Sequence, residues 1–453
     1  MEQTKETTIW MTRNWPHAIF KSCKNEWWLS FKKHHLHSLK DLSNLICSQI
    51  SHLKVTQQLK RDKKKMATEN RYPETENQEK QTPFHGDLLD KIVSHIPTIH
   101  LVPSFYVSKS WQRAVFSCVG NPSRSKPWLI IYVQSRRNLS STTTHAYDPS
   151  SNVWMKITGP SNVTYTSPLR SSHSDTLYML SPSKFSLSSD PLHEMWLDVV
   201  GPRVWRTDPI VAIVGSCIVV AGGTCDFEDD PFTVELYDTA CPGWFTCQPI
   251  HNIPKDSAAS IWLSVAVSDH KMYLLEKNSG TFCSFDPSTK TWSGDIGSFD
   301  LRPDPAIYFS VIGFVGGRLI LVGLMGDPEN AESLRIWEVN CDRFNCEEVG
   351  KMPREMLDML KNENSTLLSI DISVAENFIY IYNSSELRDI FFCDLSARVR
   401  QWSSVQCTFL NDRVLMDRFV FTCSKVNLDN LRKASWVGSK KFKVELAETV
   451  LIQ

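Results

Sequence analysis

A short aromatic and acidic signature recurs through most of this 453-residue chain. In the clearest copies an aromatic residue precedes Asp, and Trp follows six positions after the Asp, as in Tyr147-Asp148 with Trp154, Tyr237-Asp238 with Trp244, and Phe285-Asp286 with Trp292. Altered copies occur at Leu197-Asp198 with Trp205, Trp337-Glu338 with Phe344, and Cys393-Asp394 with Trp402. Successive acids are 40 to 56 residues apart, a period that is typical of repeat architectures.

Runs of β-branched and aromatic residues precede the signatures and are bounded by turn residues, which is the pattern of β-strands. Examples are WLIIYV (128–133), CIVVAGG (217–223), KMYLL (271–275) and FIYIY (378–382). A small sheet of this kind cannot bury both faces alone, so the copies are expected to stack radially and close on themselves. The sequence predicts a mainly β fold, a six-bladed β-propeller, in which the run 418–428 returns to complete the first blade.

Two glycine doublets, Gly222-Gly223 and Gly316-Gly317, accompany these strand runs. Together with the later aromatic residue and Trp, they resemble the kelch repeat, in which a Gly-Gly doublet follows a strand and Tyr and Trp come after it. The resemblance implies a kelch-type propeller over residues 126–430. We expect the signature tryptophans to pack between blades rather than to bind a ligand; these are Trp154, Trp244 and Trp292.

Residues 84–116 have apolar positions at helical spacing, and Asp87 and Pro97 are suited to begin and end the first helix. The apolar face of that helix comprises Leu88, Leu89, Ile92, Val93 and Ile96. Two further short helices are expected from the spacing of Leu101, Phe105, Val107 and Trp111. About 35 residues are too few to be stable without a partner or an adjoining domain.

The order of these residues, and above all the Val107-to-Trp111 segment VSKSW, resembles the F-box. Phe84 and His85 stand where that family usually has Leu-Pro. The resemblance implies a small all-α F-box domain at 81–119 that precedes the propeller. A helical hairpin that packs only on the propeller is the alternative. The resemblance further implies that the ligase adaptor Skp1 is bound by Leu88, Leu89, Ile92, Ile96, Pro97, Val107 and Trp111.

The first 65 residues differ in composition from the rest of the chain. They carry 13 Lys and Arg against 5 Asp and Glu and end in the basic run KRDKKK (60–65), although the whole chain has a net charge of −1. The run is compatible with a nuclear localisation signal, a transit peptide or a nucleic-acid patch, but Glu2 and Glu6 argue against a transit peptide. We expect residues 1–80 to be a disordered extension and polar leader, and translation to begin often at Met66.

No pattern in the sequence indicates catalysis, a metal or a cofactor. The Gly-x-Ser-x-Gly elbow and the glycine-rich phosphate loops are missing. A copper-containing propeller oxidoreductase is the enzymatic alternative, but the histidines His173, His193, His251 and His270 are scattered. No apolar run reaches the roughly 20 residues of a membrane span. We expect a non-catalytic protein of the cytoplasm, the nucleus or both, with no nucleic-acid or membrane partner.

From Phe84 to its end the chain resembles the plant F-box/kelch-repeat proteins, with a linker at 120–126 and a tail at 431–453. The resemblance implies the substrate-recognition subunit of an SCF-type (Skp1–cullin–F-box) ubiquitin ligase, whose propeller binds a target for ubiquitination and proteasomal degradation. The motifs THAYDPSSNVW and HLVPSFYVSKSW look closest to the subgroup that recognises phenylpropanoid or flavonoid enzymes, chalcone synthase among them. A kelch scaffold protein without a ligase role is the alternative function.

Target contacts are expected from variable loops of the propeller. The segments CDFEDDPF (225–232) and GDPENAES (326–333) have loop composition, and both are acidic. Their charge favours a basic patch on the target.

Overall fold

The computed structural model divides into two compact units, one of helices and one of β-sheets. The helical unit combines the N-terminal part of the chain with Asn427–Lys443, and the β unit comprises Lys126–Val426 and Val444–Gln453. The predicted N-terminal extension with Met66, Phe84, His85 and most of the linker lie outside the described residues. The structure describes residues 86–120, 126–160, 163–223, 231–251, 253–254, 257–293, 299–361, 366–397, 400–410, 417–447 and 449–452.

The helical unit contains α3 (Asp87–Ser94), α4 (Thr98–Ser104), α5 (Lys109–Val119) and α7 (Leu428–Trp436). Pro97 separates α3 from α4 because proline cannot continue a helix. Ser108 caps α5, since its hydroxyl accepts a hydrogen bond from the Trp111 amide at 3.3 Å. Asn427 and Asn430 form a reciprocal capping box at the start of α7. The segment that the sequence suggested as a tail thus contains most of a helix of this unit.

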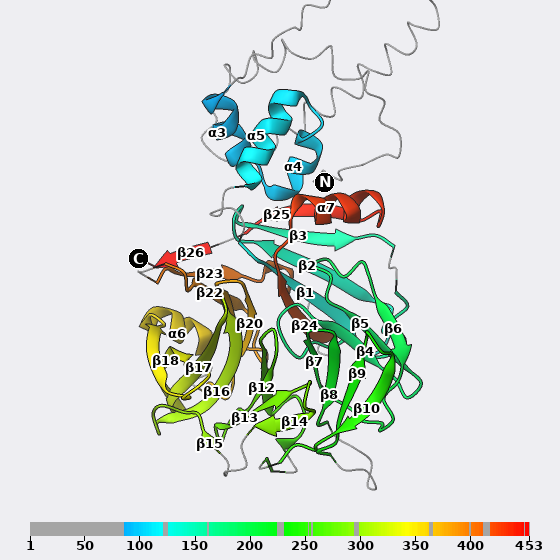
Figure 1. Cartoon of the computed structure of the whole chain (residues 1–453). Helices are drawn as coiled ribbons and strands as arrows, with labels where there is room; N and C mark the ends of the chain where they lie inside the picture. Colours follow the sequence, from blue (N-terminus) through cyan, green and yellow to red (C-terminus); the bar gives the residue numbers. More distant parts are fainter. Residues whose placement is uncertain are drawn as a thin grey trace, which may run out of the picture. The chain divides into compact units, whose positions relative to one another are not determined.

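Six antiparallel sheets form a six-bladed propeller, as the repeat predicted (Figure 1). The blades are, from inner to outer strand: blade 1, β24 (Asp417–Ser424), β1 (Trp128–Ser135), β2 (Thr142–Asp148), β3 (Val153–Thr158) and β25 (Lys441–Leu446); blade 2, β4 (Leu177–Leu180), β5 (Lys184–Ser188) and β6 (Leu197–Val200); blade 3, β7 (Ile210–Val214), β8 (Cys217–Ala221), β9 (Val234–Asp238) and β10 (Gly243–Cys247).

The other three blades follow the same order. They are blade 4, β11 (Leu263–Val267), β12 (Met272–Glu276), β13 (Thr281–Asp286) and β14 (Thr291–Ser293), with β15 (Phe299–Asp300) also on β13; blade 5, β16 (Ile307–Val315), β17 (Arg318–Asp327), β18 (Asn330–Val339) and β19 (Cys346–Lys351); and blade 6, β20 (Asp371–Ala375), β21 (Phe378–Tyr382), β22 (Asp389–Asp394), β23 (Trp402–Gln406) and β26 (Thr449–Ile452). Helix α6 (Arg354–Lys361) connects blades 5 and 6 and buries Met356, Leu357 and Leu360 in their shared core.

The C-terminal part of the chain closes the propeller. Strand β24 pairs antiparallel with β1, from Trp128 opposite Ser424 to Ser135 opposite Asp417 (Figure 1). This pairing confirms the predicted return of the run 418–428. β25 and β26 add to the outer strands of blades 1 and 6, edges that could otherwise pair with another chain.

Three signature tryptophans join neighbouring blades, as the sequence predicted. Each lies in an outer strand opposite the signature aromatic of its own blade, for example Trp154 opposite Tyr147. Each indole N–H then donates to a backbone carbonyl of the preceding blade. The pairs are Trp154 with Gln406 at 2.9 Å, Trp244 with Val200 at 2.8 Å, and Trp292 with Gln248 at 3.0 Å.

The copy of the signature in blade 2 has a different position from the others. Asp148 ends the third strand of blade 1, whereas Asp198 lies in β6, the outer strand of blade 2, where Leu197 pairs with Leu187. Phe344, which takes the Trp position in blade 5, lies in the turn between β18 and β19. The repeat period therefore located blades 2 and 5 correctly, but it did not assign the signature residues of these blades to the right strands.

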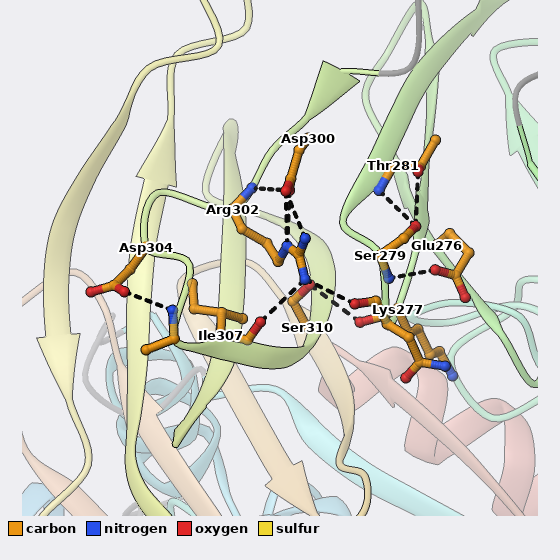
Figure 2. A network of polar contacts seen from close by, with 11 residues as sticks. Glu276, Lys277, Ser279, Thr281, Asp300, Arg302, Asp304, Ile307 and Ser310 are labelled. Carbon is orange, nitrogen blue, oxygen red and sulfur yellow. Dashed lines mark hydrogen bonds and ion pairs between the residues drawn. The ribbon is translucent and has the colours of Figure 1, made fainter. Parts of the chain in front are cut away.

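Two cations at the end of the propeller near blades 4 and 5 each have a carboxylate partner. The Arg302 guanidinium pairs with Asp300 at 2.7 Å and also donates to the carbonyls of Asn278 and Ile307 at 3.0 and 3.2 Å (Figure 2). Lys277 Nζ lies 3.3 Å from Asp371 Oδ1 at the start of β20. Arg302 thus connects blade 4 with blade 5 through two backbone carbonyls, and Lys277 connects blade 4 with blade 6 through an ion pair.

Two buried histidines are expected to make the stability of the β unit depend on pH. Burial lowers the pKa of His193 to about 3 and that of His145 to about 4, whereas a histidine in an unfolded chain titrates near 6.5. As the pH falls from about 6.5 to about 4, the unfolded state binds protons that the folded state does not, so stability that is complete above this window is lost within it.

We therefore expect the melting temperature to fall across this pH window, and to fall less in the variant His193→Gln. The glutamine amide can replace the ring in its hydrogen bonds to the hydroxyls of Ser188 and Thr422. Thermal melts at a series of pH values measure the effect. Equal pH dependence in the variant and the wild type would contradict it.

Candidate docking surface of the helical unit

The seven residues predicted to contact an adaptor differ in their exposure. Leu88 is 53% exposed on α3, whereas Leu89, Ile92 and Ile96 are 2%, 8% and 1% exposed. The other three are half-buried; they are Pro97, Val107 and Trp111. Leu88 thus offers the most exposed apolar side chain of the set, and the adaptor contacts of all seven stay a prediction.

Helical geometry separates the two adjacent leucines of α3. Successive residues of an α-helix are rotated by about 100°, so Leu88 points away from the face that carries Leu89 and Val93. That face packs against α5, where Val115 and Cys118 are buried. The Cys118 thiol also donates to the Val93 carbonyl at 3.7 Å. The apolar stripe of α3 is therefore covered largely by another helix of the same chain.

Aromatic side chains extend the exposed surface beyond α3. Phe105 follows α4, and its ring centroid lies 5.2 Å from Phe116 of α5 and 5.1 Å from Tyr106. Tyr106 lies 5.0 Å from Trp436 of α7. Three of the four rings are well exposed, at 60% for Phe116, 40% for Tyr106 and 46% for Trp436. We call these four residues the aromatic ridge; Phe116, Tyr106 and Trp436 were not among the residues singled out from the sequence.

Arg432 connects α7 to the aromatic ridge. Its guanidinium carbon lies 5.6 Å from the Phe105 ring centroid, 5.7 Å from that of Tyr106 and 5.0 Å from that of Trp436. A cation at this distance from a ring face is attracted by the ring quadrupole. Its Nη1 also pairs with Asp429 at 3.2 Å. Arg432 therefore contributes to holding α7 on α4 and the residues that follow it, together with the buried side chain of Leu431.

Part of this surface has a sequence signal. Arg432 and Trp436 are four residues apart, so a helix places them on one face. Phe105 and Phe116 were within the F-box segment. What the sequence lacks is any sign that residues near 430 pack on residues near 105, because the whole propeller lies between them in the chain.

The loops predicted to contact a target join the second and third strands of their blades. Residues 225–230 of the first loop lie outside the described residues, between β8 and β9, and residues 326–333 include the turn between β17 and β18. Because all blades have the same strand order, β8 and β17 both end at the same end of the propeller. The target contacts of the two loops stay a prediction.

A candidate metal site and a membrane-spanning helix are both absent from the described part of the chain. It contains no group of three or more His, Cys, Asp or Glu side chains that could hold a metal ion. No helix among the same residues is long and apolar enough to cross a membrane. His193, weighed above as a metal ligand, lies instead between the hydroxyls of Ser188 and Thr422, at 3.1 and 3.4 Å.

Comparison with known proteins identifies the family. No protein-family model matches the chain. It is 38% identical to the F-box/kelch-repeat protein At1g23390 of Arabidopsis thaliana over 372 residues, which are 79% of this chain and 93% of the relative. It is 27% identical to Kelch repeat and BTB domain-containing protein 8 of Danio rerio over 128 residues, 28% of this chain and 20% of that protein. With a helical unit before a six-bladed propeller, the chain belongs to the plant F-box/kelch-repeat family.

Proposed function

We propose that this protein is the substrate-recognition subunit of an SCF-type ubiquitin ligase, in which the helical unit binds a Skp1-like adaptor and the propeller binds a protein target. The observation that carries the proposal is the exposure of Leu88 and Phe116, at 53% and 60%, on two helices that pack together. Apolar side chains gathered on an exposed surface mark a site for another protein. The family supports the choice of adaptor.

The proposed activity depends on proximity alone. The adaptor connects the helical unit to a cullin and so to a ubiquitin-charged enzyme, while the propeller holds the target. Holding two proteins together raises the effective concentration of the target's acceptor lysines near the charged enzyme. In this proposal the chain is a non-catalytic subunit that needs no cofactor, and it acts in the cytoplasm, the nucleus or both.

Enzymes of phenylpropanoid or flavonoid synthesis are the first targets to test. The support is the likeness of THAYDPSSNVW and HLVPSFYVSKSW to the subgroup that recognises such enzymes. The first motif covers β2, the following turn and part of β3, and the second belongs to the helical unit. Both motifs have structural roles, so the test must be a binding measurement with the purified enzymes.

The adaptor interface is tested with the variants Leu88→Asp and Phe116→Asp in the full-length protein. We expect each to weaken binding to a Skp1-like protein by about 30-fold, because a central apolar contact contributes about 2 kcal/mol to an interface. The double variant should lose co-purification with the adaptor. Titration of the adaptor against the purified protein measures the affinity.

Ile261→Asp is a matched control, since Ile261 is an exposed apolar residue of the propeller at 66%. It should bind the adaptor like the wild type. Wild-type protein that ignores the adaptor would overturn the ligase proposal in favour of a kelch scaffold protein. Binding that survives the double variant would place the adaptor interface elsewhere.

A further inference from the structure

Three arginines lie close together where blades 1 and 2 meet. Arg418 is near the start of β24, the inner strand of blade 1, opposite Gln134 of β1. Arg136 comes two residues after Gln134, in the connection from β1 to β2. Arg170 belongs to the inner segment of blade 2, where it exchanges two backbone hydrogen bonds with Tyr178, of 3.0 and 2.9 Å.

The buried side chain of Gln134 connects the two blades at this point. It is 1% exposed, and its Oε1 accepts a hydrogen bond of 2.9 Å from the amide of Leu169, the residue before Arg170. The positions of Arg136, Arg170 and Arg418 are therefore fixed by strand pairing and by this contact. We call these three residues the arginine cluster.

Within the described residues, the arginine cluster has one ion pair for its three cations. Arg170 pairs through Nη1 with Asp208, and Asp417 is next to Arg418 in the chain. Tyr178 cannot supply an anion, because its hydroxyl donates to the Pro209 carbonyl at 2.7 Å and burial raises its pKa. Nη1 of Arg418 is buried and has no hydrogen-bond partner in the described part of the chain.

The charges of the arginine cluster act on one another. Burial lowers the pKa of Arg418, and the charge of Arg136 lowers it further. Burial also lowers the pKa of Arg170, and the charge of Arg418 lowers it further. Arginine stays protonated in proteins, so these directions express repulsion between cations and loss of water. An anion would relieve both and would accept a hydrogen bond from the unpartnered nitrogen.

Unlike Arg418, two other cations at the same end of the propeller, near blades 4 and 5, have carboxylate partners. There Arg302 pairs with Asp300 (Figure 2), and Lys277 pairs with Asp371. A buried guanidinium N–H without an acceptor is costly, and natural proteins seldom retain one without a reason. Because no acceptor for Arg418 Nη1 lies among the described residues, an acceptor from another molecule can bind there.

We propose that Arg136, Arg170 and Arg418 form an anion-binding site that receives an acidic segment of the target, bound through Asp or Glu carboxylates. Guanidinium groups match carboxylates in geometry and bind them through two parallel hydrogen bonds. Arg136 is exposed and the Arg170 side chain is 25% exposed, so the site is open and suits a side chain on a peptide rather than an enclosed small ion. The inference rests on the proposed function, because it assigns part of the target site.

The test uses the full-length protein and a short fluorescent peptide of alternating Glu and Gly. We expect binding that weakens with salt, and no binding of the matched peptide with Gln in place of Glu. Arg418→Gln should weaken binding about tenfold or more through loss of charge-assisted hydrogen bonds. Arg318→Gln is the charge-matched control, since Arg318 pairs with Glu338 at 2.9 Å in blade 5, and it should bind like the wild type.

Arg418→Gln breaks no ion pair within the described residues, so we expect the variant to fold like the wild type. Its melting temperature checks this. Equal binding of the Glu and Gln peptides, or equal loss in Arg418→Gln and Arg318→Gln, overturns the proposal. Binding of a phosphoserine peptide alone overturns the carboxylate assignment. The peptide assay contains no adaptor, so its result is independent of the adaptor titration. Peptide binding without adaptor binding would support the anion site and reject the ligase proposal. Adaptor binding without peptide binding would reject the anion site alone.

Discussion

Replacing Glu235 with alanine is expected to lower the free energy of unfolding of the propeller by about 3–5 kcal/mol, the usual cost of removing one partner from a buried ion pair. Glu235 and Arg206 both have fully buried side chains, and Arg206 Nη2 lies 2.6 Å from Glu235 Oε2. The variant leaves a buried guanidinium without its counter-ion.

The surroundings of this pair make the cost high. Both Glu235 carboxylate oxygens accept backbone amides, from Arg203 at 2.8 Å and Val204 at 3.2 Å. Arg206 Nη1 donates to the carbonyls of Gly222 and Thr233. The pair thereby holds the connection from blade 2 to blade 3 against β9. Glu235→Ala removes the acceptor of three donors at once, the Arg203 and Val204 amides and Arg206 Nη2, and each costs about 1–3 kcal/mol unless water reaches it.

Denaturant unfolding measures this prediction, with Glu338→Ala as the control. Glu338 pairs with Arg318 at 2.9 Å, but its side chain is 38% exposed, so its loss should cost less than about 1 kcal/mol. A double variant with apolar residues at 206 and 235 should recover much of the stability, because well-packed apolar replacements of a buried pair are often neutral. Equal effects at Glu235 and Glu338 would refute the argument.

Trp154→Ala is expected to cost about 3–5 kcal/mol of unfolding free energy, as large core truncations of aromatic residues do. Trp154 is 1% exposed, belongs to the core that blades 1 and 6 share, and donates its indole N–H to Gln406. Trp154 therefore acts where the first blade meets the last blade and the propeller closes. Loss of its ring leaves a cavity along the closing contact.

Trp154→Phe separates the hydrogen bond from the packing. It keeps most of the ring and leaves the Gln406 carbonyl without its donor, so we expect a loss of about 1–2 kcal/mol. The comparison variant is Trp292→Phe, which removes the equivalent hydrogen bond to Gln248 between blades 3 and 4. Similar losses in both variants are expected from the repeated geometry. A loss below about 0.5 kcal/mol in both would show that the indole hydrogen bonds do not hold the blades together.

The repeat made the propeller predictable because strand and turn chemistry is local. Tyr147, Asp148 and Trp154 lie within one hairpin, so their spacing in the sequence reflects a register that the chain must adopt. Blade 2 departed from this rule because the connection from β5 to β6 is longer, and Asp198 moved to the outer strand. The strands β25 and β26 had no repeat signature, since they add to finished blades.

The docking surface was only partly predictable. The spacing of Leu88 and Leu89 located α3 but could not say which leucine faces solvent until α5 was in place. The arginine cluster was not predicted at all, because Arg136, Arg170 and Arg418 come from three separate segments. Only the closing strand β24 brings the third of them to the other two.

The pairing of β24 with β1 also means that the propeller can close only late in synthesis, once residues 417–424 have been made. A ribosome that stalls before residue 417 releases a product whose first blade has no inner strand and whose F-box helices have no α7. Such a fragment exposes an unpaired β1, which quality-control factors can detect. Premature termination therefore yields neither a closed ring nor a complete helical unit.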